Sequence, residues 1–172
     1  DPITSLVPLE SASVSSDFAL DVANSNEAPV LATAVPDQAA TQGQAFRYTV
    51  PAGSFADIDA GDVLSYSASL ASGAALPGWL GFDAATRSFS GTPANADVGS
   101  LTVRVTATDL AGAEAADDFM LAVANVNDAP TVAMPIADQP ATEDQSFSFT
   151  VPAGSFADVD AGDALRYGAT LP

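Results

Sequence analysis

Three aspartates within six residues form the densest group of reactive side chains in this sequence. Asp57, Asp59 and Asp62 lie in the stretch FADIDAGD at 55–62, and the nearly identical stretch FADVDAGD recurs at 156–163. Two carboxylates about 4 Å apart repel by roughly 4 kcal/mol at an effective dielectric constant near 20. A fold that gathers several of them must bind a cation, protonate some of them or splay them apart. The spacing therefore predicts a cation site in each copy.

The second acidic stretch belongs to a longer internal repeat. Positions 26–71 and 127–172 align without a gap at an offset of 101, and 27 of these 46 positions are identical. Residues 17–24 also align with 118–125 at the same offset. Self-similarity at a fixed period is typical of tandem arrays. We therefore predict three parts: the C-terminal strand region of a preceding repeat (1–26, with 1–16 unassigned), one complete repeat (27–127), and the N-terminal part of the next (128–172).

The composition narrows the possible partners. The 172 residues include 22 acidic residues and four arginines but no Lys, His or Cys, and the net charge is -18. Nucleic acid and anionic membrane surfaces are poor partners for such a chain, whereas divalent cations are good ones. A hydrophobic fraction of 48% is enough to build a core. No apolar run approaches the roughly 18 residues of a membrane span, so we expect no membrane insertion by this segment.

Alternating apolar residues predict strands rather than helices. The alternation is clear at 46–50, 64–70, 101–107 and 119–123, and shorter candidates lie at 79–82 and 87–90. Such a pattern is typical of strands with one buried and one wet face. The alternation also predicts strands at 18–22 and 147–151. About seven short strands in about 100 residues favour an all-β fold, an antiparallel immunoglobulin-like β-sandwich repeated with a 101-residue period.

Four motifs carry a resemblance to a known family. They read NVNDAP at 125–130, FADIDAGDVLSY at 55–66, LPGWLGFDAATRSFSGTP at 76–93 and VTATDLAG at 105–112. In this combination the chain after Asp17 resembles the bacterial cadherin-like repeats, most closely the dystroglycan-type cadherin-like (putative Ig) domains of large secreted and surface proteins. The resemblance implies calcium at the junctions between successive repeats.

The resemblance also implies which residues hold the ions. The first junction would use linker residues, the Asp-x-Asp loop and the ATD motif, namely Asn24, Asn26, Glu27, Asp57, Asp59 and Asp109, with Asp62 as a further ligand or loop former. The second junction would use Asn125, Asn127, Asp128, Asp158, Asp160 and Asp163. It lacks a counterpart of Asp109 within the sequence, so we expect it to be the weaker site.

One position departs from the family pattern. Family members often carry an acid before the second strand, where the second copy has Glu143 and Asp144 but the first copy has Gln42 and Gly43. The number of ions at the first junction therefore stays open.

The ligand chemistry independently favours calcium. Calcium accepts six to eight hard oxygens in loose geometry, whereas magnesium dehydrates reluctantly and zinc prefers His or Cys. The competing interpretation is that these acids are solvated residues that form Asx turns. The recurrence of three acidic or amide clusters at one spacing favours the metal.

Three functions compete at this stage. The first is a calcium-rigidified spacer or adhesive segment of a bacterial surface-associated or secreted protein, with neighbouring repeats and a cell-surface protein or polysaccharide as partners. The second is a carbohydrate- or protein-binding module attached to a secreted enzyme, for which Trp79, the single Trp, would be the sugar platform. The position of Trp79 in a predicted strand instead favours a place for its ring in the core. The third is an enzyme, which the lack of His, Cys and Lys disfavours, although a carboxylate-pair glycosidase stays formally open.

Overall fold

The computed structural model describes residues 16–59 and 61–170, so the sequence prediction for 1–15 lies outside the described residues. In chain order the strands are β1 (Val30–Leu31), β2 (Gln38–Thr41), β3 (Phe46–Thr49), β4 (Phe55–Ala56), β5 (Ser65–Leu70), β6 (Leu80–Asp83), β7 (Ser88–Gly91), β8 (Gly99–Thr108), β9 (Glu114–Ala124), β10 (Thr131–Val132) and β11 (Phe156–Ala157). A single-turn 3-10 helix, η1 (Asn95–Asp97), precedes β8. In the described ranges no helix is long and apolar enough to cross a membrane.

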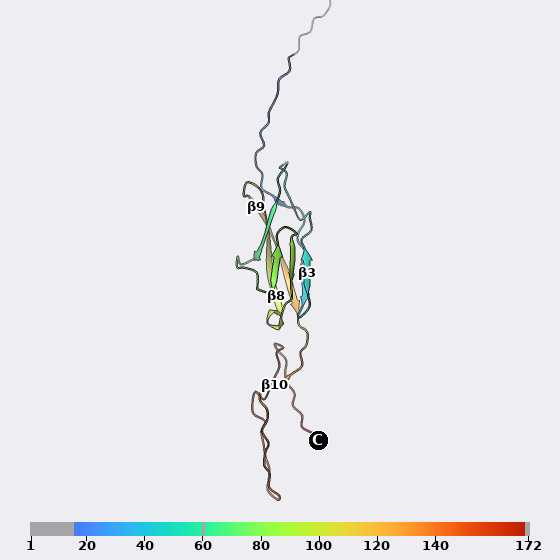
Figure 1. Cartoon of the computed structure of the whole chain (residues 1–172), viewed down its shortest axis with the longest axis vertical. Helices are drawn as coiled ribbons and strands as arrows, with labels where there is room; N and C mark the ends of the chain where they lie inside the picture. Colours follow the sequence, from blue (N-terminus) through green and yellow to red (C-terminus); the bar gives the residue numbers. More distant parts are fainter. Residues whose placement is uncertain (1–15, 60, 171–172) are drawn as a thin grey trace, which may run out of the picture.

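Seven of these strands form two sheets in the middle of the chain (Figure 1). The first sheet has the order β2-β9-β8-β5 and the second has the order β3-β7-β6. The pairing is antiparallel except that β2 runs parallel to β9, with Gln38 opposite Leu121. The all-β prediction is confirmed, and β2 is a strand that the alternation did not reveal.

The core is formed by the inward side chains of both sheets. Residues that alternate along β8 and β9 are buried, as the sequence predicts: Val103, Val105, Ala107, Phe119, Leu121 and Val123. Phe89 of the opposite sheet meets Phe119 edge to face, with ring centroids 5.6 Å apart. Tyr48 packs against both rings. Apolar burial and aromatic pairing therefore hold the sheets together.

Trp79 lies at the edge of this core. It is partly buried and packs against the core residues, so the prediction of a core position is confirmed while full burial is not. Gly91 of β7 faces it closely, because a Cβ at Gly91 would lie 1.8 Å from the Trp79 carbonyl oxygen. Only a glycine allows the two backbones to approach in this way.

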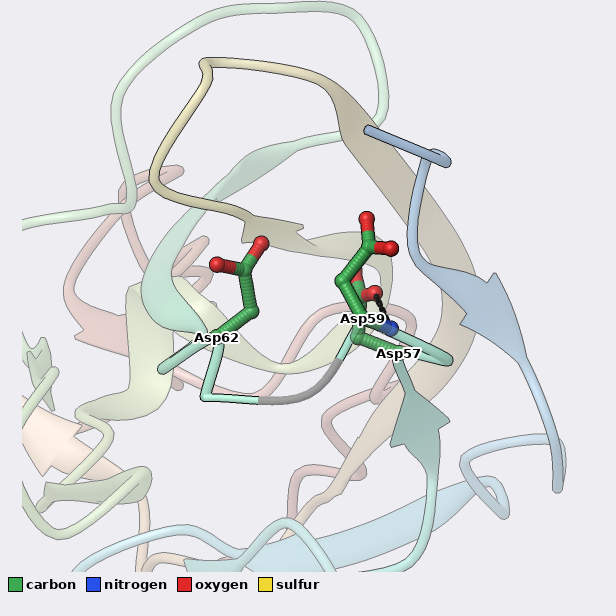
Figure 2. Close-up of side chains that lie close together, drawn as sticks. All are labelled: Asp57, Asp59 and Asp62. Carbon is green, nitrogen blue, oxygen red and sulfur yellow. Dashed lines mark hydrogen bonds between the residues drawn. The ribbon is translucent and has the colours of Figure 1, made fainter. Parts of the chain in front are cut away.

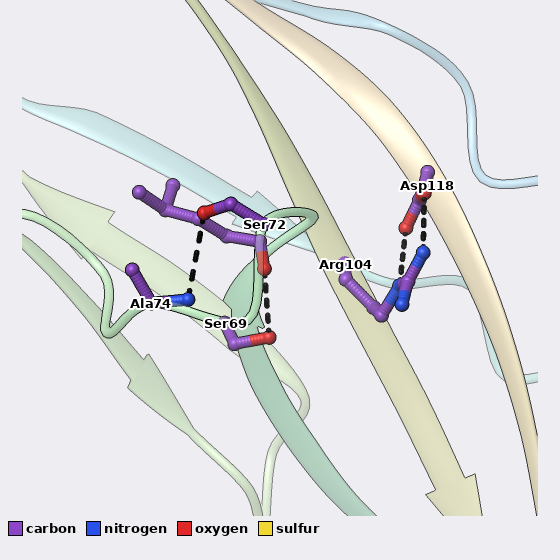
Figure 3. A network of polar contacts seen from close by, with 6 residues as sticks. Ser69, Ser72, Ala74, Arg104 and Asp118 are labelled. Atoms are coloured by element: carbon purple, nitrogen blue, oxygen red, sulfur yellow. Dashed lines mark hydrogen bonds and ion pairs between the residues drawn. The ribbon is translucent and has the colours of Figure 1, made fainter.

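The outer face of the larger sheet is polar. Arg104 of β8 and Asp118 of β9 form a two-pronged ion pair across the ladder, with both N···O distances at 2.8 Å (Figure 3). Nearby, the Ser72 hydroxyl accepts the Ala74 N–H in the turn after β5. This face carries charge and hydroxyls rather than an aromatic row.

Two predicted strands are absent. Residues 16–29 form no strand, and Phe18, Leu20 and Val22 are 85%, 77% and 77% exposed. The segment 147–151 also forms no strand, and Phe147 is 56% exposed. These predictions are wrong for the described structure. A strand requires a ladder partner, and the alternating pattern alone does not supply one.

The second copy repeats one pairing of the first. Val30 lies opposite Ala56 and Leu31 opposite Phe55 in β1–β4. In β10–β11, Thr131 lies opposite Ala157 and Val132 opposite Phe156, so each residue number is larger by 101. Each pair leads directly into an acidic stretch. The same local frame therefore supports both copies of that stretch, while the tandem array itself stays a prediction.

Candidate metal centre

The acidic loop after β4 brings three carboxylates together. Asp57, Asp59 and Asp62 each offer an oxygen, and these atoms lie within 4.8 Å of one another. Figure 2 shows the Asp59 and Asp62 side chains rising from the same side of the loop. The Asp59 N–H donates to the Asp57 carboxylate at 2.9 Å, and the Asp62 N–H donates to the Asp59 carbonyl at 3.2 Å. The predicted clustering of these three residues is thus present in the fold.

The linker before the repeat binds directly to this loop. The Asn24 side-chain amide donates to Asp59 Oδ1 at 2.8 Å, and the Glu27 N–H donates to Asp59 Oδ2 at 2.7 Å. Asp59 is consequently only 8% exposed although it carries a charge. Hydrogen bonds from the linker compensate this burial.

The loop between β8 and β9 supplies a fourth carboxylate. Asp109 is 6% exposed and accepts the Asn26 side-chain amide at 3.0 Å and the Ala113 N–H at 2.8 Å. The linker therefore bridges two loops that are far apart in the sequence. Six of the seven residues predicted for the first junction are joined by hydrogen bonds that involve a side chain: Asn24, Asn26, Glu27, Asp57, Asp59 and Asp109. The seventh, Asp62, is joined through its backbone N–H.

Two carboxylate oxygens of the cluster have no compensating donor. Asp57 Oδ2 and Asp62 Oδ2 are buried and lack a hydrogen-bond partner among the residues described. An unpaired buried carboxylate oxygen is costly, and a coordinated cation removes that cost. A hard divalent cation fits these oxygens and this donor set.

The pKa shifts also indicate that the charges converge. Burial raises the pKa of Asp62, and the nearby charges of Asp57, Asp109 and Asp59 raise it further. The pKa of Glu27 is raised chiefly by its hydrogen bond with Asp59 and also by burial and neighbouring charge. Like charges disfavour one another's ionised form. Five carboxyl groups therefore form one electrostatic group: Glu27, Asp57, Asp59, Asp62 and Asp109.

Linker amides have the opposite effect on the pKa of the two most buried acids of this first group. The Asn24 amide lowers the pKa of Asp59, with help from the Glu27 N–H. The Asn26 amide lowers the pKa of Asp109, with help from backbone donors of the same loop. These hydrogen bonds therefore stabilise the anionic forms of Asp59 and Asp109.

The second acidic loop has the same local geometry. Asp158, Asp160 and Asp163 offer oxygens within 4.8 Å of one another. Asp160 accepts the Asp128 N–H at 2.7 Å, and its own N–H donates to Asp158 at 3.0 Å. Asp160 Oδ1 is buried without a partner among the described residues. This cluster fits a cation in the same way.

The linker of the second cluster is attached less completely. The Asn127 side chain donates to the Asp128 carbonyl at 2.8 Å, as the Asn26 side chain does to the Glu27 carbonyl at 3.1 Å. Asn125, the counterpart of Asn24, lies beside the second loop, but no hydrogen bond joins it to Asp160 in the described part of the chain. The second linker therefore makes fewer hydrogen bonds to its own acidic loop than the first linker does, and the weaker second site stays a prediction.

Two residues at the second cluster were not predicted as junction residues. Gln42, which departs from the acidic family pattern, lies at the second junction, where its side chain contacts Asp128 at 3.0 Å. It follows β2 directly, and β2 ends beside the C-terminal end of β9, at the far end of the sandwich from Asp59. Asn95 lies in η1, and its side chain contacts the Val159 carbonyl. Amides are too common for sequence alone to reveal such contacts.

Comparisons with known proteins agree with this architecture. The family described as "Putative Ig domain" matches residues 28–124. The chain belongs to this family. The match covers the sandwich together with the loops that carry Asp57, Asp59, Asp62 and Asp109.

A solved structure of cadherin domains shares the fold. Extracellular cadherin domains 1–4 of protocadherin gamma B7 match with a TM-score of 0.58 at 22% identity, over 81% of this chain and 34% of that one. An endo-fucoidan hydrolase of glycoside hydrolase family 107 matches with a TM-score of 0.47 at 21% identity, over 58% and 14%. An α-galactosidase-like protein from Bacteroides fragilis matches with a TM-score of 0.42 at 18% identity, over 60% and 19%. The chain spans at most 34% of these proteins, and no curated protein matches it.

Proposed function

We propose that this chain is a calcium-binding spacer of a bacterial surface or secreted protein, in which calcium stiffens the junctions between tandem repeats. The proposal includes the division into 1–26, 27–127 and 128–172, and a structural role without catalysis. Calcium and the neighbouring repeats are the partners, and a cell-surface protein or polysaccharide is the final target of the array. Membership of the immunoglobulin-like family and the cadherin-like fold support an extracellular location.

One observation carries the proposal. The linker residues Asn24, Asn26 and Glu27 contact acids of the repeat that follows them, through Asp59 and Asp109. An ion bound to these acids and to linker oxygens is fully coordinated only in one orientation of the linker. Binding energy therefore selects that orientation, because a ligand shifts an equilibrium by its differential affinity for the two states.

Repulsion acts in the opposite direction when the cation is removed. Asp57 and Asp62 then keep buried oxygens without donors, and Glu27 adds a further carboxyl to the same group. These groups lower their energy by moving apart or taking up protons. The junction should consequently bend more freely in chelator than in calcium.

The surroundings of Trp79 favour this role over the carbohydrate-binding alternative. Trp79 packs against the core, and its carbonyl meets the backbone of Gly91. A sugar platform needs an exposed ring face, so this residue offers little support for a saccharide site.

Small-angle X-ray scattering tests the proposal on a chain extended at both ends to whole repeats. The maximum dimension and its spread should be measured in millimolar calcium, in magnesium and in chelator. We expect a longer and narrower distribution in calcium alone. The same distribution in all three conditions would refute the proposed stiffening.

A further inference from the structure

Two side-chain amides of the 27–127 repeat reach the segment that follows it. Gln42 is fixed at the end of β2, because its N–H donates to the Ala124 carbonyl at 3.0 Å. Its side-chain oxygen accepts the Val126 N–H at 3.2 Å, and its amide nitrogen donates to Asp128 Oδ2 at 3.0 Å. Gln42 thus ties the last strand of the sandwich to a carboxylate of the second linker.

Asn95 makes the second contact from another part of the repeat. Its side-chain amide donates to the Val159 carbonyl at 2.5 Å. Val159 stands between Asp158 and Asp160, in the middle of the second acidic loop. Ala96 and Val98 of the repeat line one hollow together with Val159 and Ala161 of that loop. The contact therefore combines a hydrogen bond with small apolar side chains.

We propose that Gln42 and Asn95 form an amide clamp, an interaction surface by which one repeat holds the next without a metal ion. Both side chains use N–H donors toward acceptors of the next repeat, one a carboxylate and one a carbonyl. A neutral donor beside Asp128 satisfies that carboxylate without adding charge. This proposal rests on the proposed spacer function. It names Gln42 and Asn95 as the residues that orient the second junction before calcium binds.

The contacts of Gln42 distinguish a clamp residue from a metal ligand. An amide nitrogen is a donor and does not coordinate a cation, and the Gln42 oxygen already accepts a backbone N–H. A clamp that pre-orients the junction should also tighten calcium binding there, since apparent affinity rises with the fraction of competent conformers.

Distance measurements between two spin labels on the full chain test the clamp. The sequence contains no cysteine, so Ser67→Cys in β5 and Val132→Cys in β10 provide unique and exposed labelling sites. In chelator the doubly labelled parent should show a narrow distance distribution. Asn95→Ala removes one hydrogen bond of the clamp and should lower the ratio of clamped to unclamped chains about twofold to tenfold. Gln42→Ala removes two side-chain hydrogen bonds and should lower this ratio by at least as much. Exposed Gln44, changed to Ala, is the matched control and should behave as the parent.

The variant Gln42→Glu separates a clamp from a ligand. It keeps the acceptor for Val126 but replaces the donor beside Asp128 with a carboxylate. It should broaden the distribution in chelator, and calcium should narrow it again. A narrow distance distribution for Gln42→Glu in chelator would overturn the clamp. The clamp would also be overturned if, in chelator, the parent distribution were as broad as that of the double variant Gln42→Ala/Asn95→Ala. Failure of calcium to narrow any distribution would instead refute the stiffening, while the chelator measurements still decide the clamp.

Discussion

Asp59 joins the linker to the acidic loop, so its replacement by asparagine should weaken calcium binding while preserving the fold. The amide has nearly the same shape as the carboxylate but carries no charge. Asp59 accepts from Asn24 at Oδ1 (2.8 Å) and from the Glu27 N–H at Oδ2 (2.7 Å), and the single oxygen of the amide can keep one of these two bonds. It lies outside the apolar core, so the sandwich should remain folded.

The expected size follows from binding linkage. Calcium at 100 times its Kd stabilises the parent by about 2.7 kcal/mol. A variant with tenfold weaker binding gains only about 1.4 kcal/mol at the same calcium concentration. One kcal/mol corresponds to about 4–8 °C in a domain of this size. The calcium-induced rise in Tm should therefore fall from about 11–22 °C to about 6–11 °C.

Differential scanning calorimetry in chelator and at this fixed calcium concentration measures both shifts. The matched control is Asp138→Asn, because Asp138 is exposed and the change in net charge is the same. The control should retain the full shift of the parent. An equal calcium-induced shift in Asp59→Asn and the parent would refute the placement of the ion at Asp59.

Three further results are expected. Gly91→Ala should destabilise the fold by about 1–3 kcal/mol or more in urea denaturation, because the new Cβ would meet the Trp79 carbonyl. The control Gly81→Ala should cost about 1 kcal/mol or less, because its Cβ would lie 3.6 Å from the nearest atom, the Ser90 carbonyl oxygen. Linker amides lower the pKa of Asp59 and Asp109 in the folded chain. The stability that these two carboxylates contribute should therefore be complete above about pH 4 and lost as the pH falls through the lowered pKa. Unfolding followed by circular dichroism in chelator, as a function of pH, checks this. Acrylamide should quench Trp79 less in the native chain than in urea; equal quenching would contradict its packing against the core.

The sequence predicts the central strands well because their alternation reflects burial on one face. Val103 and Phe119 lie inward as their pattern requires, and both are buried. The strand β2 reads Gln-Ala-Ala-Thr and has no strong alternation, so its parallel pairing with β9 could not be predicted. At 18–22 and 147–151 the pattern is strong, but no ladder forms. Periodicity specifies which face a strand would bury, and pairing depends on another segment.

The candidate site was predictable where it rests on clustered charge. The two acidic loops stand out in the sequence, and the structure gathers each into a compact group. The resemblance names Asn24 and Asn26 as calcium ligands, and the structure shows their amides donating hydrogen bonds to Asp59 and Asp109. Gln42 and Asn95 were not predicted, because their contacts arise from the placement of β2 and η1 at one end of the sandwich. Such contacts depend on tertiary structure alone.

Equilibrium dialysis of the full chain against buffered calcium measures the central claim, that the acidic loops bind this ion. At neutral pH, with millimolar magnesium present, we expect saturable calcium binding, tighter at the first loop than at the second. Asp59→Asn should weaken the tighter binding, and Asp160→Asn the weaker. Calcium that stays at the same concentration on both sides of the membrane, up to the millimolar range, would contradict the account.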